Sequence, residues 1–488
     1  MKTQNVTINF TGGIVSPGYL KQVLEVAQHA RVKEVRFGLR QQMRLDVPAQ
    51  FFALFEQLCK EKNIAVYKTK DALPNIVSSY AASGIFATDS WLREGVYKDV
   101  FALFNFTPWL KINITDNKQC FVPFFTGHIN WISSSSEHFW HLYVRFPKTG
   151  LLYRWKELVY TNDLPHLSQR IEQEILADKF LFWGNVNADG DLLYQRVKHL
   201  TAYVNKPVNE AASVDFSLPY YEGFNKDGNQ LWLGIYRRDE KFSLQFLLDA
   251  CEVCLQTRIG ELYTTPWKSI IIKNIDAGSR KLWDFVLGKY RINVRHAANE
   301  LAWQVEDYRE KGLQLKGHII RHFDKEDVRT YGLCFAIETE PSSSLFGSVI
   351  IRKQQNNNPH RFKMLERYDI FYKRNFDPNE NELILYREGV EKDFIGTYLV
   401  SLCKDFYSEQ TIIPLDHTSA EQVESKQKKE INSIHQCQHC LTVYVPVIGD
   451  EEQGVLPHTS FDALPTTYAC PLCESPKEDF VEVEEMNG

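Results

Sequence analysis

The same order of helical and strand-like hydrophobic spacing occurs twice along this chain, 227 positions apart. In the first copy, residues 19–32 place apolar side chains at helical spacing, residues 33–47 alternate as strands do, and residues 49–63 form a second amphipathic helix. In the second copy the order returns in residues 243–258, 260–275 and 277–290. A strand-like segment precedes each copy. This order predicts an antiparallel or mixed sheet with helices on one face, which is an α+β fold class.

Two longer segments, one between the copies and one after them, contain further strand-like runs such as "GSVIIRK" and "NELILYREG". We expect these segments to form a second α+β layer that is also duplicated. A polar stretch near the C-terminus is rich in Glu, Gln, Lys and Ser, as flexible linkers are. The sequence therefore predicts six parts: first copy (1–70), first layer segment (71–225), second copy (226–292), second layer segment (293–414), linker (415–434) and C-terminal domain (435–488).

The overall composition excludes several classes of protein. Of the 488 residues, 44% are hydrophobic, and the net charge of −6 gives no indication of a nucleic-acid or anionic-membrane partner. No apolar run approaches the length of about 18 residues that a membrane-spanning helix needs, and the N-terminus lacks a signal-peptide pattern. We therefore expect a cytoplasmic protein without a membrane or nucleic-acid partner.

Negative charge is concentrated at the C-terminus. Residues 437–488 contain ten acidic residues and one base, Lys477, which gives a net charge of −9. Since the whole chain carries −6, about +3 remains for everything before this segment. The acidic segment is therefore a unit with its own electrostatic character.

Four of the ten cysteines form two Cys-x-x-Cys pairs in this acidic unit: Cys437 with Cys440, and Cys470 with Cys473. Two such pairs facing each other make a tetrahedral cage of four sulfurs, which suits zinc or iron. Disulfides are disfavoured in a reducing compartment. On spacing alone, structural zinc and redox iron fit equally well.

The residues between the cysteine pairs resemble rubredoxin along their whole length. The matching positions are Tyr444, Pro446, Gly449, Asp450, Gly454, Pro457, Thr459, Phe461, Leu464, Pro465 and Phe480. The resemblance implies one iron bound by the thiolates of Cys437, Cys440, Cys470 and Cys473. It also implies one-electron transfer with a separate redox protein that docks at the acidic rubredoxin surface. Leu441 and Glu474 differ from the family, which usually has glycine at these two positions.

The body of the chain is similar to the sirohaem-dependent sulfite and nitrite reductases, whose ferredoxin-like half-domains the two copies resemble. Arg40-Gln41 falls on the Arg-Gln motif of that family, and Thr265-Pro266-Trp267 falls on its Thr-Pro-Trp motif. The six remaining cysteines lack the two pairs that hold a four-iron cluster there, so we expect no such cluster. The resemblance implies that Arg40 and Lys111 bind an anion or a tetrapyrrole, whereas Pro74 and Asn113 replace an expected arginine and lysine.

These observations lead to one preferred function and two alternatives. We expect one-electron transfer through the rubredoxin iron, with the body docking a redox partner or an anionic ligand in nitrite- or sulfite-type metabolism. One alternative is an oxidoreductase of nitrite or sulfite reductase type, in which the rubredoxin delivers electrons to sirohaem or another acceptor in the body. The other is a non-catalytic binding protein with structural zinc in its tail.

Overall fold

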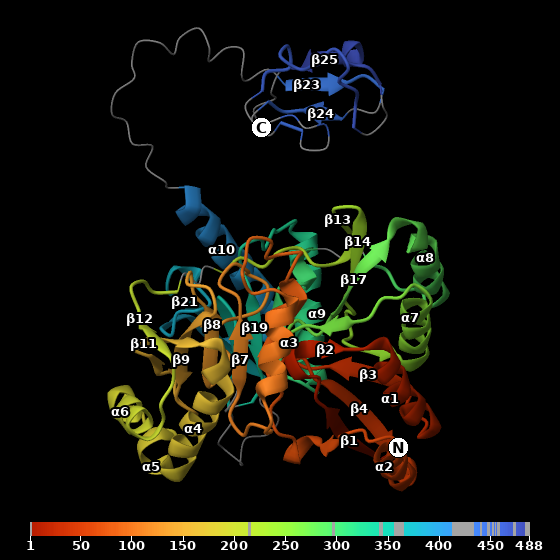
Figure 1. The fold of residues 1–488 in the computed structure, drawn as a ribbon. Coiled ribbons are helices and arrows are strands. Elements are labelled where there is room, and N and C mark those ends of the chain that lie inside the picture. Colours follow the sequence, from red (N-terminus) through yellow and green to blue (C-terminus); the bar gives the residue numbers. More distant parts are fainter. Residues whose placement is uncertain are drawn as a thin grey trace, which may run out of the picture. The chain divides into compact units, whose positions relative to one another are not determined.

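The computed structural model describes the chain in two compact units, Met1–Glu409 and Gln410–Gly488 (Figure 1). Each unit is treated by itself below. The described residues are 2–212, 216–294, 298–340, 345–355, 366–411, 434–439, 442–446, 449–450, 453, 455, 459–471 and 475–483. The predicted linker, residues 415–434, lies outside the described residues except for its last position.

Two antiparallel five-stranded sheets contain the two copies of the repeat. The first repeat sheet has the order β15-β3-β4-β1-β5, formed by β1 (Thr3–Ile8), β3 (Glu34–Phe37), β4 (Met43–Pro48), β5 (Tyr67–Lys68) and β15 (Phe242–Ser243). The second repeat sheet has the order β13-β14-β17-β16-β2, formed by β2 (Ile14–Val15), β13 (Gly223–Asp227), β14 (Gln230–Ile235), β16 (Leu262–Thr264) and β17 (Ile270–Asp276). The bounds of β1 and β14 differ by 227 at both ends, so the offset seen in the sequence is also an offset in structure.

Four helices cover one side of these two sheets (Figure 1). They are α1 (Pro17–His29), α2 (Phe52–Glu61), α7 (Leu244–Gln256) and α8 (Arg280–Lys289), and α7 also follows α1 by 227 residues. Apolar side chains of all four helices and both sheets form one hydrophobic core. The two copies also exchange strands, because β2 joins the second repeat sheet and β15 joins the first. The copies therefore fold as a single unit.

Two mixed sheets form the second layer and share one strand order. In the first mixed sheet, β6 (Val77–Ser78), β7 (Ile112–Thr115) and β8 (Ile129–Ser133) run parallel, and β9 (Phe139–Arg145) runs antiparallel to β8. In the second mixed sheet, β18 (Trp303–Val305), β19 (Phe335–Glu338) and β20 (Val349–Lys353) run parallel, and β21 (Arg367–Lys373) runs antiparallel to β20. The predicted duplicated α+β layer is therefore confirmed.

The helices of this layer repeat as well. Helix α3 (Glu94–Leu103) connects β6 to β7 as α9 (Glu310–Lys325) connects β18 to β19. Helix α4 (Leu164–Ala177) follows β11 (Glu157–Tyr160), and α10 (Lys392–Thr411) follows β22 (Leu383–Glu391). The remaining elements are β10 (Leu152–Arg154), β12 (Asn205–Pro207), α5 (Lys179–Phe182) and α6 (Gly190–Leu200). Among the described residues, no helix combines the length and apolar character needed to cross a membrane.

The buried side chain of Gln41 connects the repeat sheets to the first mixed sheet. Its Nε2 donates to the carbonyl oxygens of Ser78 and Thr264, both at 3.0 Å, and its Oε1 accepts the Ser78 N–H at 2.9 Å. Gln41 has a positive φ of 60° in the turn between β3 and β4. This turn orients the preceding residue, Arg40, toward the centre of the unit.

In the described part of the C-terminal unit, three strands form an antiparallel sheet in the order β24-β23-β25. Its strands are β23 (Ile434–Cys437), β24 (Val443–Tyr444) and β25 (Phe480–Val483). Its hydrophobic core contains Cys437, Tyr444, Val455, Phe461, Leu464, Tyr468, Cys470 and Phe480. Two of the four predicted metal ligands are therefore part of this core.

Candidate functional site

Cys437 and Cys470 occupy equivalent turns in the C-terminal unit. The Cys437 N–H donates to the carbonyl of Thr442 and the Cys470 N–H donates to the carbonyl of Ser475, each over 2.8 Å and each five residues ahead. Both cysteines are fully buried. The two Cys-x-x-Cys segments thus begin with the same backbone arrangement, as expected for two knuckles that share one metal.

The other two predicted ligands, Cys440 and Cys473, lie outside the described residues, as do Leu441 and Glu474. The residues present nevertheless fit a single iron, because two of the four thiols are buried together in one core and the pattern supplies two more. His439 lies between Cys437 and Cys440 in the sequence, but its position does not suit a metal ligand. Its side chain is 61% exposed, and its Nε2 lies 3.2 Å from Oδ2 of Asp479.

Aromatic side chains pack behind the two buried cysteines. The ring of Phe461 lies 5.7 Å from Tyr444 and 5.4 Å from Phe480, measured between ring centroids. The Tyr444 hydroxyl donates to the Thr459 carbonyl at 2.8 Å, and burial raises the pKa of Tyr444. The Tyr444 phenol is therefore neutral and anchored, and these rings share one apolar core with Cys437 and Cys470.

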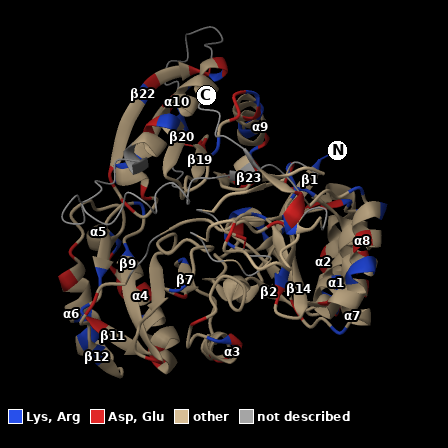
Figure 2. Ribbon diagram, turned by 90° about the horizontal axis from the view of Figure 1, so that it is seen from above, with Lys and Arg blue, Asp and Glu red and all other residues tan. Residues whose placement is uncertain are grey.

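A second candidate site is a cavity of about 390 Å³ in the first unit, which we call the central cavity. Residues from the first copy, the first mixed sheet and the second mixed sheet all line it, among them Arg40, Lys111, His128, Asp307 and Phe346. Basic residues occur beside β7 and β9 in this region (Figure 2). Pro266 of the second copy also lines it, so the cavity lies where both copies meet the two mixed sheets.

Arg40 lines this cavity, but its guanidinium group is mostly occupied by protein acceptors. Its Nε and Nη2 donate to the Asn75 carbonyl at 3.0 and 2.8 Å, Nη2 also donates to the Ile112 carbonyl at 2.8 Å, and Nη1 donates to Asn113 Oδ1 at 3.1 Å. Burial lowers the pKa of Arg40 to about 9, so it stays charged at neutral pH. Arg40 therefore contributes charge to the cavity and holds its walls together.

Lys111 and His128 also line this cavity. Burial, together with the nearby charge of Arg40 and Arg145, lowers the pKa of Lys111 to about 8. The Lys111 N–H donates to His128 Nδ1 at 3.1 Å, which places the imidazole proton on Nε2. Burial and the charge of Lys111 lower the pKa of His128 to about 3. His128 is therefore a neutral hydrogen-bond donor beside a cationic lysine.

Two further basic residues, Arg145 and Lys373, line a smaller adjoining cavity of about 50 Å³ that shares Leu345 and Phe346 with the first. Burial lowers the pKa of both, that of Lys373 to about 8. We call Arg40, Lys111, Arg145 and Lys373 the basic cluster. Arg145 and Lys373 were not predicted from the sequence, although each is the last residue of equivalent strands, β9 and β21, at an offset of 228.

Asp307 is the acidic side chain that faces this cluster among the described lining residues. Its Oδ2 lies 2.9 Å from Nη2 of Arg44, and its Oδ1 lies 3.4 Å from Nζ of Lys268. Both of its oxygens are thus already engaged by cations outside the basic cluster. The cavity therefore has a net positive charge and suits an anion. Asn113, which replaces an expected lysine, is used structurally, since its Nδ2 donates to Thr126 Oγ1 at 2.8 Å.

Comparison with known proteins identifies the C-terminal unit. Residues 434–480 match the family model Rubredoxin. A rubredoxin from Synechocystis sp. is 41% identical over 54 residues, which are 11% of this chain and 47% of that protein. A probable rubredoxin, HupI, from Bradyrhizobium diazoefficiens is 43% identical over 49 residues, 10% of this chain and 71% of that protein. This chain therefore spans less than half the length of the Synechocystis rubredoxin.

Most of the chain has a solved structural neighbour. The structure of the Mycobacterium tuberculosis NirA protein aligns with a TM-score of 0.64 and 13% identity, covering 86% of this chain and 82% of that one. The expected sulfite and nitrite reductase fold is therefore confirmed at the level of fold. The expected rubredoxin domain is confirmed by sequence, and through residues 434–480 this chain belongs to the rubredoxin family.

Proposed function

We propose that this protein is a one-electron carrier whose body binds an anionic ligand, in nitrite- or sulfite-type metabolism. Cys437, Cys440, Cys470 and Cys473 would hold a single iron, and that iron, when bound, supplies ferric–ferrous redox chemistry. The observation that carries the proposal is the rubredoxin match, together with two fully buried cysteines in equivalent turns. A separate redox protein would exchange electrons with this domain.

The chain's own residues support rapid electron exchange. Tyr444, Phe461 and Phe480 are buried in the same core as Cys437 and Cys470, so they would exclude water from that side of an iron held by these cysteines. A shell of four thiolates leaves no open position for a substrate. The C-terminal domain therefore suits transfer of electrons rather than chemistry on a bound molecule.

The body would supply the binding function. The basic cluster combines four cationic side chains with the neutral N–H donor of His128, and Asp307 is held by Arg44 and Lys268. Arg40, Arg145 and Lys373 are partly buried, whereas the Lys111 side chain is exposed. Partly buried cations bind anions more strongly than exposed ones, because less water competes for them. A small oxyanion such as nitrite or sulfite matches these donors.

The absorption spectrum of the purified, iron-loaded protein tests this proposal. We expect the visible bands of ferric thiolate, bleached on reduction, without the Soret band of a tetrapyrrole. A colourless protein that contains stoichiometric zinc after expression in iron-rich medium would contradict the proposal and favour a structural role for the tail.

A second candidate function, reduction of a substrate at a tetrapyrrole in the body, is favoured by the apolar part of the central cavity. Pro74, Pro123, Pro266, Leu345 and Phe346 line it beside the basic cluster, so a ligand with an apolar ring and carboxylate groups would meet both surfaces. The described lining residues include no cysteine, and the His128 Nδ1 is already an acceptor. A Soret band in the spectrum described above would favour this candidate.

Anion binding by the body is expected to weaken as the pH rises through about 8. The pKa of Lys111 is lowered to about 8, so this residue is charged below that pH and loses its charge above it. A charge-assisted hydrogen bond contributes about 1.5–3 kcal/mol, which corresponds to about tenfold or more in affinity. Calorimetric titration with nitrite, whose own charge is constant in this range, measures the effect.

Lys111→Met is expected to bind nitrite about tenfold more weakly at neutral pH and to lose much of this pH dependence, with Lys373 supplying the remainder. The matched control is Lys118→Met, an exposed lysine of the same segment that does not line the cavity. Equal affinities for Lys111→Met and the unmodified protein would show that the anion does not bind at this cavity.

A further inference from the structure

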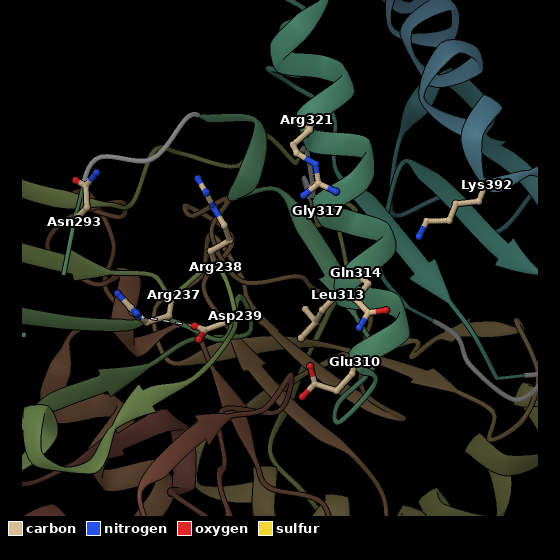
Figure 3. A pocket seen from close by; sticks show the side chains of 10 residues that line it. All are labelled: Arg237, Arg238, Asp239, Asn293, Glu310, Leu313, Gln314, Gly317, Arg321 and Lys392. Atoms are coloured by element: carbon tan, nitrogen blue, oxygen red, sulfur yellow. Dashed lines mark ion pairs between the residues drawn. The ribbon is translucent and has the colours of Figure 1, made fainter. Parts of the chain in front are cut away.

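A separate groove of about 860 Å³ lies on another part of the first unit, between the chain that follows β14, helix α9 and the start of α10 (Figure 3). Four basic side chains line it: Arg237, Arg238, Arg321 and Lys392. They come from the segment after β14, from α9 and from the start of α10. The positive charge therefore comes from three separate parts of the chain and not from one face of a helix. None of these residues belongs to the central cavity or to the basic cluster.

The four cations differ in how far protein carboxylates neutralise them. Arg238 forms an ion pair with Glu300, whose side chain is only 2% exposed, and Arg237 lies 3.9 Å from Asp239. Within the described part of the chain, Arg321 and Lys392 have no ion-pair partner. Glu310 is the remaining acid of the lining, and it already pairs with Arg36. The groove therefore has uncompensated positive charge.

The geometry of the groove leaves this charge accessible. Figure 3 shows Arg321 on α9, above Gly317 and Leu313 of the same helix, and Arg238 on the chain that faces this helix. A Cβ at Gly317 would lie 3.7 Å from Arg321 Nη1, so the guanidinium group extends along the open surface of the helix. The Arg238 side chain is 70% exposed although it pairs with Glu300. Both guanidinium groups can accept further carboxylate partners.

The exposure of this groove argues against a small-molecule ligand. Pockets for small molecules typically bury about 70–90% of the ligand surface, whereas a ligand here would keep much of its surface in water. The described lining residues include no aromatic side chain, so the groove offers no stacking surface for a nucleotide base. A broad surface with exposed arginines is instead suited to carboxylates presented by another protein.

We propose that this groove docks an acidic surface of an electron-transfer protein. The inference rests on the proposed electron-carrier function, because such a protein needs a redox partner to complete its reaction. Weak redox encounters bury little surface and depend on charge to orient the two proteins. Residues 437–488 of this chain, with a net charge of −9, show how acidic a redox domain of this class can be. Aspartate and glutamate side chains of the partner would pair with Arg321 and Lys392.

Binding of a fluorescently labelled peptide of ten glutamates to the full-length, iron-loaded protein tests this proposal by fluorescence anisotropy. We expect binding at low ionic strength that weakens as salt is added, because exposed charge pairs are screened. The double variant Arg321→Glu/Lys392→Glu should bind at least about tenfold more weakly, since two attractive pairs become repulsive. The matched control, Lys60→Glu/Lys62→Glu, reverses two exposed lysines of the α2 region and should bind normally.

Three results would overturn the proposal. They are absence of peptide binding at low ionic strength, an equal loss in the control variant, and tighter binding of inorganic pyrophosphate than of the peptide at the same groove. The last result would identify a phosphate ligand instead. The visible spectrum of the same samples reports the iron centre independently, so failure of this inference and failure of the electron-carrier function are distinguished.

Discussion

Replacing Cys470 with serine is expected to abolish the ferric-thiolate absorption of the iron-loaded protein. Cys470 is fully buried and begins the second knuckle, and a serine hydroxyl at that place does not supply a thiolate to the metal. Metal binding and folding are coupled in such a small domain, so loss of one metal ligand also destabilises the domain. The measurement is the visible spectrum together with the iron content per chain.

The matched control is Cys120→Ser. Cys120 is a half-buried cysteine of the first unit and is absent from both candidate sites. This variant should retain the full iron content and an unchanged spectrum. Retention of one iron and of the thiolate bands in Cys470→Ser would show that the metal is held elsewhere, and the assignment of the four ligands would then be wrong.

The repeated architecture could be predicted from the sequence because its signal is local. The apolar spacing of α1 returns in α7, and the alternation of β1 returns in β14, both at the offset of 227. The exchange of β2 and β15 between the copies could not be predicted, because each strand has only two residues and two residues show no period. Tertiary contacts rather than local preference determine where such short strands pair.

The chemistry of the central cavity was only partly predictable. Arg40 was predicted from the Arg-Gln motif and Lys111 from the resemblance to the same family, and both residues line the cavity. The occupation of the Arg40 guanidinium group was not visible, because its acceptors are mainly backbone carbonyls of Asn75 and Ile112, and every residue type has such a carbonyl. Arg145 and Lys373 lie 228 positions apart and meet only through the pseudo-symmetry of the two mixed sheets. Their offset of 228 differs from the 227 of the repeat sheets, so the repeat found in the sequence does not by itself pair these two residues.

The cysteine site shows the opposite behaviour. Its pattern extends over fewer than forty residues, so the sequence alone locates the four thiols, and the resemblance of the residues between them to rubredoxin favours iron over zinc. The structure adds the equivalence of the turns at Cys437 and Cys470. Leu441 and Glu474, which stand where the family usually has glycine, lie outside the described residues.

Lys268→Met is expected to lower the free energy of unfolding of the first unit by about 3–5 kcal/mol. The Lys268 ammonium group is almost fully buried, and its Nζ donates to Glu240 Oε2 at 2.6 Å and to the Val305 carbonyl at 2.7 Å. Methionine fills similar space but leaves the buried Glu240 carboxylate without its cation. Urea denaturation followed by tryptophan fluorescence measures the loss, and Lys281→Met, which removes an exposed lysine of α8, should change stability by no more than about 0.5 kcal/mol.

The second substitution Glu240→Gln separates loss of the ion pair from loss of packing. If the cost of Lys268→Met comes from the unpaired carboxylate, removing that charge should recover a large part of it, and the double variant should be more stable than the sum of the single effects predicts. Simple additivity would contradict this account. Recovery should remain incomplete, because Asp307 also loses Lys268 as a partner and keeps only Arg44. The part of the stability that is not recovered would then measure how much Lys268 contributes by pairing with Asp307, the carboxylate that faces the basic cluster.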